Sequence, residues 1–257
     1  MAGKKTDFFD KLSHKRSMRR WARFSRDAQG ADIGELRNQR SAARLLRSHL
    51  DKLIHTADER LALPAIGATN FPRPRNSDWG WRPEVWRGSV PRAGMSSVQT
   101  KSVFGDEVTL FHDCALNELT LRQIRNQHER DLAPYGLRMD VFKFSGSFLS
   151  LVIDLPQEAV QGLKKSHLLG MNTIVEMENP LEIFGRLNIK HGPNTEQIVR
   201  ELPLNAEDVT VEFDLAYSKM NEKRIEKAWI DLIFEGPEMN QITLRDLTFS
   251  RRPRAAL

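Results

Sequence analysis

The sequence of 257 residues has a single cysteine, Cys114, which excludes an internal disulfide framework and a metal site built from several cysteines. It also has no apolar run near the roughly 18 residues that a membrane-spanning helix needs. Lys4 and Lys5 lead into a polar stretch and not into the apolar segment of a secretory signal. The sequence therefore predicts a globular protein in the cytoplasm, either free or peripheral to a membrane.

Common catalytic and phosphate-binding motifs are missing as well. There is no G-x-x-x-x-G-K loop and no G-x-G-x-x-G after a strand, which argues against two widespread modes of nucleotide binding. Neither a G-x-S-x-G elbow nor an H-E-x-x-H zinc motif is present. His112 and Cys114 would point the same way from a strand, but a metal would need two more ligands. We expect no metal and no other cofactor, and a binding protein in preference to an enzyme.

What the sequence does have is an uneven distribution of charge. The formal net charge is +5, yet residues 1–92 carry 20 Lys and Arg against 10 Asp and Glu, whereas the rest carry 19 against 24. Ten of these 20 basic residues lie in residues 15–26 and 37–47. A field of this sign attracts nucleic acid, acidic lipid, acidic polysaccharide or the protein's own acidic half.

Residues 1–63 predict a helical arm. Asp32 followed by Glu35 resembles a capping box at the start of a long helix, and Pro64 closes it. An earlier helix from Thr6 to about Ala28 would complete a helical hairpin, with its turn at residues 29–31. One stripe of the long helix is apolar at heptad spacing and consists of Leu36, Ala43, Leu46, Leu50, Leu53 and Ala57. This Leu36 to Leu53 stripe predicts either packing within the hairpin or self-association.

Six basic side chains gather in the first predicted helix. They are Lys15, Arg16, Arg19, Arg20, Arg23 and Arg26. The spacing of Arg16, Arg19, Arg20 and Arg23 places four of them on one helix face, where they would bind phosphates of nucleic acid or anionic lipid headgroups. The alternative is an ordinary solvated face, or one docked on the acidic half of the chain.

Residues 64–96 predict an extended linker, because prolines recur through them and break regular structure. The linker also holds Trp79, Trp81 and Trp86. Flat aromatic faces stack on sugar rings and on bases, so these three residues are candidate ligand-binding residues. The alternative is that they pack the linker against the following domain.

From residue 97 onward the apolar residues alternate with a period of two. We predict strands at residues 98–104, 107–112, 119–124, 137–144, 148–155, 173–177, 181–189, 197–202, 209–215, 229–234 and 242–249, with one short helix after Pro156. Turn signals between them predict an antiparallel β-sandwich or jelly roll over residues 97–257. The fold class is mainly β, preceded by the helical arm.

The clearest enzymatic candidate is the pair Glu212 and Asp214. Residues at i and i+2 of a strand face the same side, as the acid and the nucleophile do in jelly-roll glycosidases. The further glutamate of that class is missing, since Ala216 and Tyr217 follow instead. A solvent-facing pair is the default for such a strand, so a glycoside hydrolase is the least favoured function. Trp229 lies in a strongly apolar strand and is predicted to be core.

Three runs carry a resemblance to a known family, namely residues 106–114 (DEVTLFHDC), 188–196 (NIKHGPNTE) and 234–240 (FEGPEMN). The chain resembles, along its whole length, an uncharacterised family of alphaproteobacterial proteins. The resemblance implies a bacterial, cytoplasmic protein and assigns no catalytic residue. The last strands, 229–234 and 242–249, also look like the end of carbohydrate-binding jelly-roll modules, an analogy of fold that does not determine function.

Together these observations predict a non-enzymatic binding module with a saccharide or a polyanion as its ligand. The first alternative is a structural or membrane-peripheral adaptor, in which the arm binds anionic lipid or nucleic acid, or pairs with a second copy.

Overall fold

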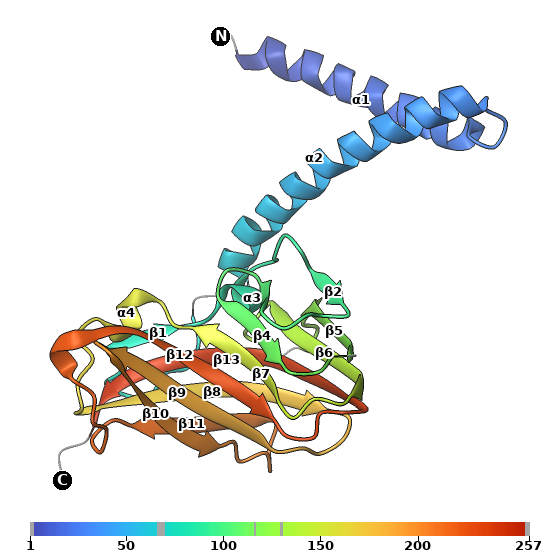
Figure 1. The fold of residues 1–257 in the computed structure, drawn as a ribbon. Coiled ribbons are helices and arrows are strands. Elements are labelled where there is room, and N and C mark those ends of the chain that lie inside the picture. The colour runs from blue at the N-terminus through green and yellow to red at the C-terminus, as the bar shows by residue number, and fades with distance from the viewer. Residues whose placement is uncertain (1–2, 66–69, 116, 129–130, 255–257) are drawn as a thin grey trace. The chain divides into compact units, whose positions relative to one another are not determined.

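A computed structural model describes residues 3–65, 70–115, 117–128 and 131–254. The chain divides into two compact units, Met1–Ile54 and His55–Leu257. The first unit is helical and the second is built from strands (Figure 1). Residues 66–69 of the predicted linker, and the side chain of Ala57 in the predicted stripe, lie outside the described part.

Two helices form the first unit and confirm the predicted helical arm. They are α1 (Gly3–Asp27) and α2 (Ile33–Ala65), and α2 includes the predicted stop, Pro64, in its last turn. Asp32 caps α2, because its Oδ2 accepts the Gly34 N–H at 2.8 Å. Glu35 accepts instead from Gln39 Nε2 at 2.8 Å, one turn along the helix. No helix in the described part of the chain is long and apolar enough to cross a membrane.

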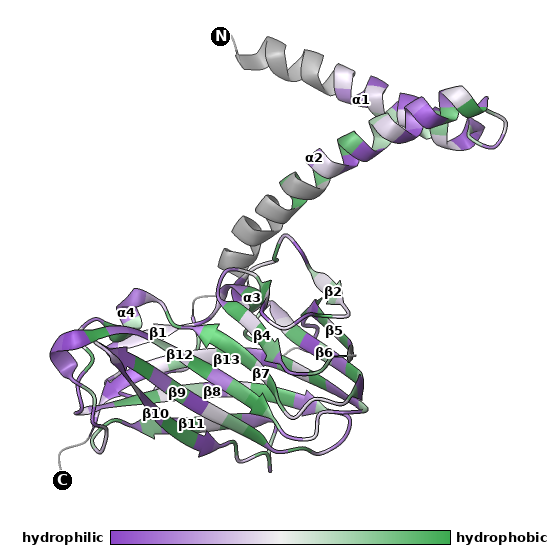
Figure 2. Ribbon diagram, viewed as in Figure 1, coloured by the Kyte–Doolittle hydropathy of each residue, from purple (hydrophilic) through white to green (hydrophobic). Residues whose placement is uncertain are grey.

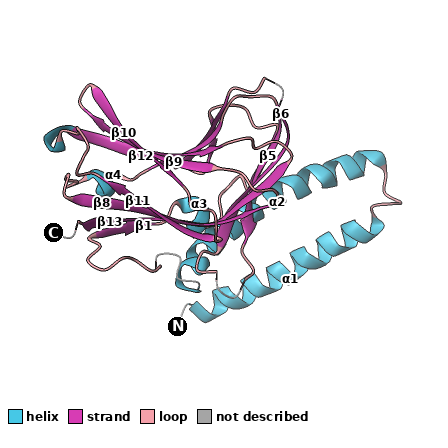
Figure 3. Cartoon of the chain, turned by 90° about the horizontal axis from the view of Figure 1, so that it is seen from below, coloured by secondary structure: helices cyan, strands magenta, loops and turns pink. Residues whose placement is uncertain are grey.

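Two antiparallel sheets form the second unit and confirm the predicted sandwich (Figures 1 and 3). The seven-stranded sheet has the order β11-β8-β13-β6-β5-β2, with β1 also paired to β13: β1 (Trp79–Trp81), β2 (Gly94–Ser96), β5 (Asn117–Arg125), β6 (Tyr135–Phe144), β8 (His167–Met177), β11 (Asp208–Asp214) and β13 (Asn240–Pro253). The six-stranded sheet has the order β10-β9-β12-β7-β4-β3: β3 (Ser102–Phe104), β4 (Val108–His112), β7 (Leu149–Asp154), β9 (Ile183–His191), β10 (Asn194–Glu201) and β12 (Ile225–Phe234).

The core lies between the sheets and is built from the alternation seen in the sequence. On β11, Val209, Val211 and Phe213 are buried, whereas Thr210 and Glu212 are exposed. This follows from the strand geometry, in which successive side chains point to opposite faces. Figure 2 shows hydrophobic residues in most strands of the sandwich. The helix predicted after Pro156 is α4 (Gln157–Val160), and a further short helix, α3 (Glu84–Arg87), and a 3-10 turn at Glu222–Arg224 are also present.

The stretch predicted as an extended linker contributes regular elements to the sandwich. Besides α3, it supplies β1, which pairs with β13, and β2, which pairs with β5. The buried Arg82 donates from Nε and one Nη to the two carboxylate oxygens of Asp246 on β13, at 2.9 and 2.8 Å. The Phe71 ring lies 5.2 Å from the Arg82 guanidinium. This ion pair holds residues 71–82 on the seven-stranded sheet. It joins residues 164 positions apart, so no local sequence pattern predicts it.

The start of β8 carries a buried histidine that makes folding sensitive to pH. His167 is 8% exposed, and its Nδ1 accepts the Lys164 N–H at 3.0 Å. Burial lowers the pKa of His167, and Arg251 and Lys164 act in the same direction while Asp78 opposes them. The folded protein therefore holds this ring neutral at pH values where the unfolded chain takes up a proton.

We expect the free energy of unfolding to fall as the pH drops below about 6.5, by at most about 1.4 kcal/mol per pH unit from this single group. Urea unfolding at pH 7.5 and 5.5 measures the change. His167→Asn should remove this component, whereas His128→Asn, which changes an exposed ring, should keep it. An unaltered pH dependence in His167→Asn would contradict the assignment.

Candidate functional site

The outer face of the six-stranded sheet carries a hollow of about 580 Å³, which we call the outer hollow. Its floor is made by side chains that alternate with the core residues of five strands. The strand registers arrange them in three rows across the sheet. The first row is Gln197, Asn188, Trp229 and Asp154; the second is Arg186, Asp231, Val152 and Thr109; the third is Ile233, Ser150 and Phe111. One continuous surface is therefore formed by five neighbouring strands, β4, β7, β12, β9 and β10.

Aromatic rings lie in the first and third rows of the outer hollow. Trp229 is half-buried in the first row, with the Lys227 ammonium 5.0 Å from its ring centroid. Phe111 is half-buried in the third row, and Phe148, which is 43% exposed, lines the same hollow. Rings of this kind give a ligand large apolar contact area.

The prediction that Trp229 belongs to the core is wrong. Its neighbours Ala228 and Ile230 point inward and are buried, so Trp229 points to the opposite face of the sheet. The outer face of β12 mixes the charged Lys227 and Asp231 with the apolar Trp229 and Ile233, so apolar character alone does not place Trp229 in the core.

A hydrogen-bonded network occupies the middle of the outer hollow. Asp231 Oδ2 accepts from Arg186 Nε at 2.7 Å and from Asn188 Nδ2 at 3.0 Å. Gln197 Nε2 donates to Asn188 Oδ1 at 2.9 Å, which extends the network to β10. Because these contacts reach Asp231 through Oδ2, its Oδ1 remains for a further donor. The network holds four polar side chains in defined positions before any ligand arrives.

Ser150 adds a hydroxyl group that the described part of the chain does not satisfy. Ser150 is 5% exposed and lines the outer hollow, between Ile233 and Phe111 in the third row. Its Oγ is buried and has no hydrogen-bond partner among the described residues. A buried hydroxyl without a partner costs about 1–3 kcal/mol, so a ligand hydroxyl placed here would recover that free energy.

The charged groups of the outer hollow balance. Arg186 and Lys227 are the basic side chains that line it, and Asp154 and Asp231 are the acidic ones. Arg186 and Asp231 are also paired with each other at 2.6 Å. The hollow therefore carries no excess of either sign, in contrast to the arm.

The predicted tryptophan platform is only partly exposed, and it lies on β1 and α3 and not in the outer hollow. Trp79 and Trp81 are half-buried on β1, with their ring centroids 6.4 Å apart, and Trp81 stacks on Phe249 at 5.7 Å. Trp86 is fully buried, and its indole N–H donates to the Leu244 carbonyl at 2.8 Å. Trp86 therefore has no surface to offer a ligand, which corrects that part of the prediction. Trp86 packs the linker against the sandwich, as in the alternative interpretation.

Glu212 and Asp214 lie on the outward side of β11, as the alternation predicts, but on the other sheet from the outer hollow. Glu212 accepts from Arg252 at 2.9 Å, and Asp214 lies 3.5 Å from Arg254. Each carboxylate thus has a cationic partner, and this arrangement gives no support to an acid and nucleophile pair.

His112 uses both ring nitrogens within the protein: Nδ1 accepts the Cys114 N–H at 3.2 Å, and Nε2 lies 2.8 Å from the Val98 carbonyl oxygen. Within the described ranges, no three His, Cys, Asp or Glu side chains gather in a way that would hold a metal ion.

The six predicted arm residues, from Lys15 to Arg26, are all exposed on α1. They do not belong to the outer hollow, which is built from the sandwich alone. Their surface is treated separately below.

The fold is a two-sheet antiparallel β-sandwich, and the outer hollow lies on the outer face of its six-stranded sheet. Residues 1–257 match the model of a family of unknown function, DUF6478, and the chain belongs to that family. This confirms the resemblance to an uncharacterised family over the whole length. No curated protein matches the chain.

Several solved structures are similar in part. The Family 11 Carbohydrate-Binding Module from Clostridium thermocellum, in complex with a β-1,3-1,4-mixed-linked tetrasaccharide, has 10% identity over 63% of this chain and 98% of that chain, with a TM-score of 0.40. The CBM22-1 xylan-binding domain from Paenibacillus barcinonensis Xyn10C has 9% identity over 63% and 94%, with a TM-score of 0.35. The enzymatically active domain of tailspike protein 4 of bacteriophage CBA120 has 6% identity over 55% of this chain and only 19% of that chain, with a TM-score of 0.39. At these values the likenesses support no conclusion about the ligand of this chain.

Proposed function

We propose that the protein is a non-enzymatic binding module and that the outer hollow binds a neutral saccharide. The observation that carries the proposal is the combination, on one sheet face, of aromatic rings with a preformed carboxylate, amide and guanidinium network. Saccharides present apolar C–H faces and many hydroxyl groups, which match these two kinds of surface. The hydroxyl of Ser150 and the Oδ1 of Asp231 supply further hydrogen-bonding positions.

The balance of charge favours a neutral ligand over an acidic one. Two basic and two acidic side chains line the outer hollow, so it has no net attraction for a polyanion. The arm, which is strongly basic, is the part of the chain suited to anions. We therefore assign the neutral saccharide to the outer hollow and anionic ligands to the arm.

The separation of the aromatic rings of Trp229 and Phe111 indicates an extended ligand. Trp229 and Phe111 are two strands apart, and their rows are four residues apart along a strand. With about 4.8 Å between strands and about 3.4 Å per residue, their Cα atoms lie roughly 16 Å from each other. One sugar ring does not reach both, so we propose an oligosaccharide or a segment of a polysaccharide.

Calorimetric titration of the full chain with neutral soluble polysaccharides, such as a β-glucan, a mannan and dextran, tests this function. We expect at least one of them to bind, with the same affinity in 0.1 and 0.5 M NaCl, because a neutral ligand releases no counterions. Alginate serves as the acidic comparison, and any binding of alginate through the arm should vanish at the higher salt concentration. The proposal is wrong if no neutral polymer of a broad panel binds, or if binding is lost in 0.5 M NaCl.

A further inference from the structure

The helical arm has a surface that the proposed saccharide site does not use. Helix α1 has two distinct faces: Ser17, Trp21 and Phe24 are half-buried on one of them. The rest of the helix surface carries five exposed arginines, which line a shallow hollow of about 950 Å³: Arg16, Arg19, Arg20, Arg23 and Arg26. Over ten residues this stripe is roughly 15 Å long.

Two of the five arginines contact aromatic rings, and none of the five has an acidic partner among the described residues. The guanidinium of Arg20 lies 5.7 Å from the centroid of the Trp21 ring, and that of Arg23 lies 6.0 Å from the Phe24 ring. Among the described residues, no acidic side chain forms an ion pair with any of the five. Residues 1–54 hold 14 Lys and Arg against 6 Asp and Glu. The stripe is therefore an unsatisfied source of positive charge.

Helix α2 adds exposed apolar side chains to this charge. Leu46, Leu50, Leu53 and Ile54 are 38%, 47%, 64% and 55% exposed, although the first three form part of the predicted heptad stripe. The exposed Arg37, Arg40 and Arg44 follow the helical repeat beside that stripe. Figure 2 shows the resulting mixture of hydrophilic and hydrophobic residues along both helices. A basic helix with an exposed leucine stripe has the composition of helices that lie at a membrane surface.

We infer that the arm binds the surface of an anionic lipid bilayer. Headgroup phosphates would pair with the arginines, and the leucines would enter the boundary between headgroups and acyl chains. A nucleic acid would use the arginines and leave the leucines exposed to water. A second copy of the arm would cover the leucines but bring like charges together. Only the bilayer makes use of both observed features.

Co-sedimentation of the full chain with vesicles tests the inference. We expect binding to vesicles of phosphatidylcholine with 25% phosphatidylglycerol, no binding to pure phosphatidylcholine, and a steep loss of binding between 0.05 and 0.5 M NaCl. Each arginine removed should weaken binding about fivefold. The variant Arg16→Ala/Arg19→Ala/Arg20→Ala/Arg23→Ala should therefore bind several hundredfold more weakly. Leu46→Ser/Leu50→Ser/Leu53→Ser should weaken vesicle binding while leaving any binding to duplex DNA unchanged.

A charge-matched control changes four exposed lysines of the sandwich to alanine, at positions Lys143, Lys164, Lys219 and Lys223. It should bind anionic vesicles as the unchanged protein does. Circular dichroism confirms that each variant keeps its helices. Equal binding to neutral vesicles, or loss of binding in the control, overturns the inference. Salt-dependent binding to duplex DNA without binding to vesicles would also overturn the inference. So would a dimer mass in sedimentation that the leucine variant reduces, if vesicles do not bind. None of these results bears on the neutral saccharide site, whose binding is measured in 0.5 M NaCl.

Discussion

Replacing Arg82 by methionine is expected to lower the free energy of unfolding by about 3–5 kcal/mol. The reason is that Asp246, which is 6% exposed, would keep a buried carboxylate without its counter-charge. Burial raises the pKa of Asp246, and Arg82 opposes that rise. Without Arg82 the carboxyl group should take up a proton more readily, so the loss of stability should be smaller at pH 5 than at pH 8. Urea unfolding at the two pH values measures both effects.

Two further variants make this prediction specific. Arg82→Met/Asp246→Leu removes both charges and should be more stable than Arg82→Met alone, because no uncompensated charge stays buried. Arg252→Met breaks the ion pair with Glu212, in which the side chains are 27% and 39% exposed, and should cost no more than about 1 kcal/mol. Equal losses in Arg82→Met and Arg252→Met would show that the linker contact contributes little to the sandwich.

Replacing Trp229 by alanine is expected to weaken binding of the neutral polysaccharide by about thirtyfold or more, which corresponds to roughly 2 kcal/mol. Trp229 supplies the aromatic surface of the first row, and its ring lies outside the core, so the fold should persist. Calorimetric titration measures the dissociation constant, and urea unfolding confirms that the variant is folded.

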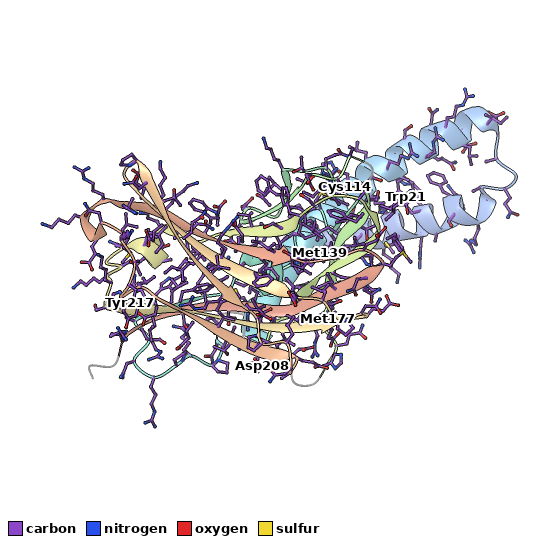
Figure 4. The ribbon with its side chains drawn as sticks, turned by 60° about the horizontal axis from the view of Figure 1, so that its bottom comes forward. Trp21, Cys114, Met139, Met177, Asp208 and Tyr217 are labelled. Atoms are coloured by element: carbon purple, nitrogen blue, oxygen red, sulfur yellow. The ribbon has the colours of Figure 1, made fainter. Side chains whose placement is uncertain are left out.

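Tyr217→Ala provides the matched aromatic control. Tyr217 is 83% exposed and lies at one end of the sandwich, at the opposite end from Cys114 (Figure 4). Its removal should leave polysaccharide binding unchanged. If Trp79→Ala abolished binding while Trp229→Ala had no effect, the ligand site would lie at the tryptophans of β1, as the sequence first indicated, and not in the outer hollow.

The sequence predicted the sandwich well because its strands alternate. In β11 the polar residues Thr210 and Glu212 separate Val209, Val211 and Phe213, so the strand and its buried face follow from the pattern alone. Asp32 likewise marked the start of α2 through local chemistry. Such features depend on neighbours in the sequence, which a single chain displays directly.

The candidate site was not predictable in the same way, because it depends on register between strands distant in sequence. Asp231 and Arg186 meet only through the pairing of β12 with β9, 45 residues apart. Trp229 misled because it is a large apolar residue on the outer face of β12, between the charged Lys227 and Asp231. One signal of the site was present in the sequence. Ser150 and Asp231 are polar residues inside largely apolar strands, and buried polar groups usually have a hydrogen-bond partner.

The alternation of inward and outward side chains has a consequence for how this family can diversify. The residues that hold the sheets together, such as Leu151 and Ile230, point inward, whereas their sequence neighbours Ser150 and Trp229 form the outer hollow. Selectivity for a different sugar could therefore arise by exchanging outward residues while the folding determinants stay fixed. Family members should accordingly vary more on that face than beneath it, and engineered libraries confined to it should retain a high proportion of folded clones.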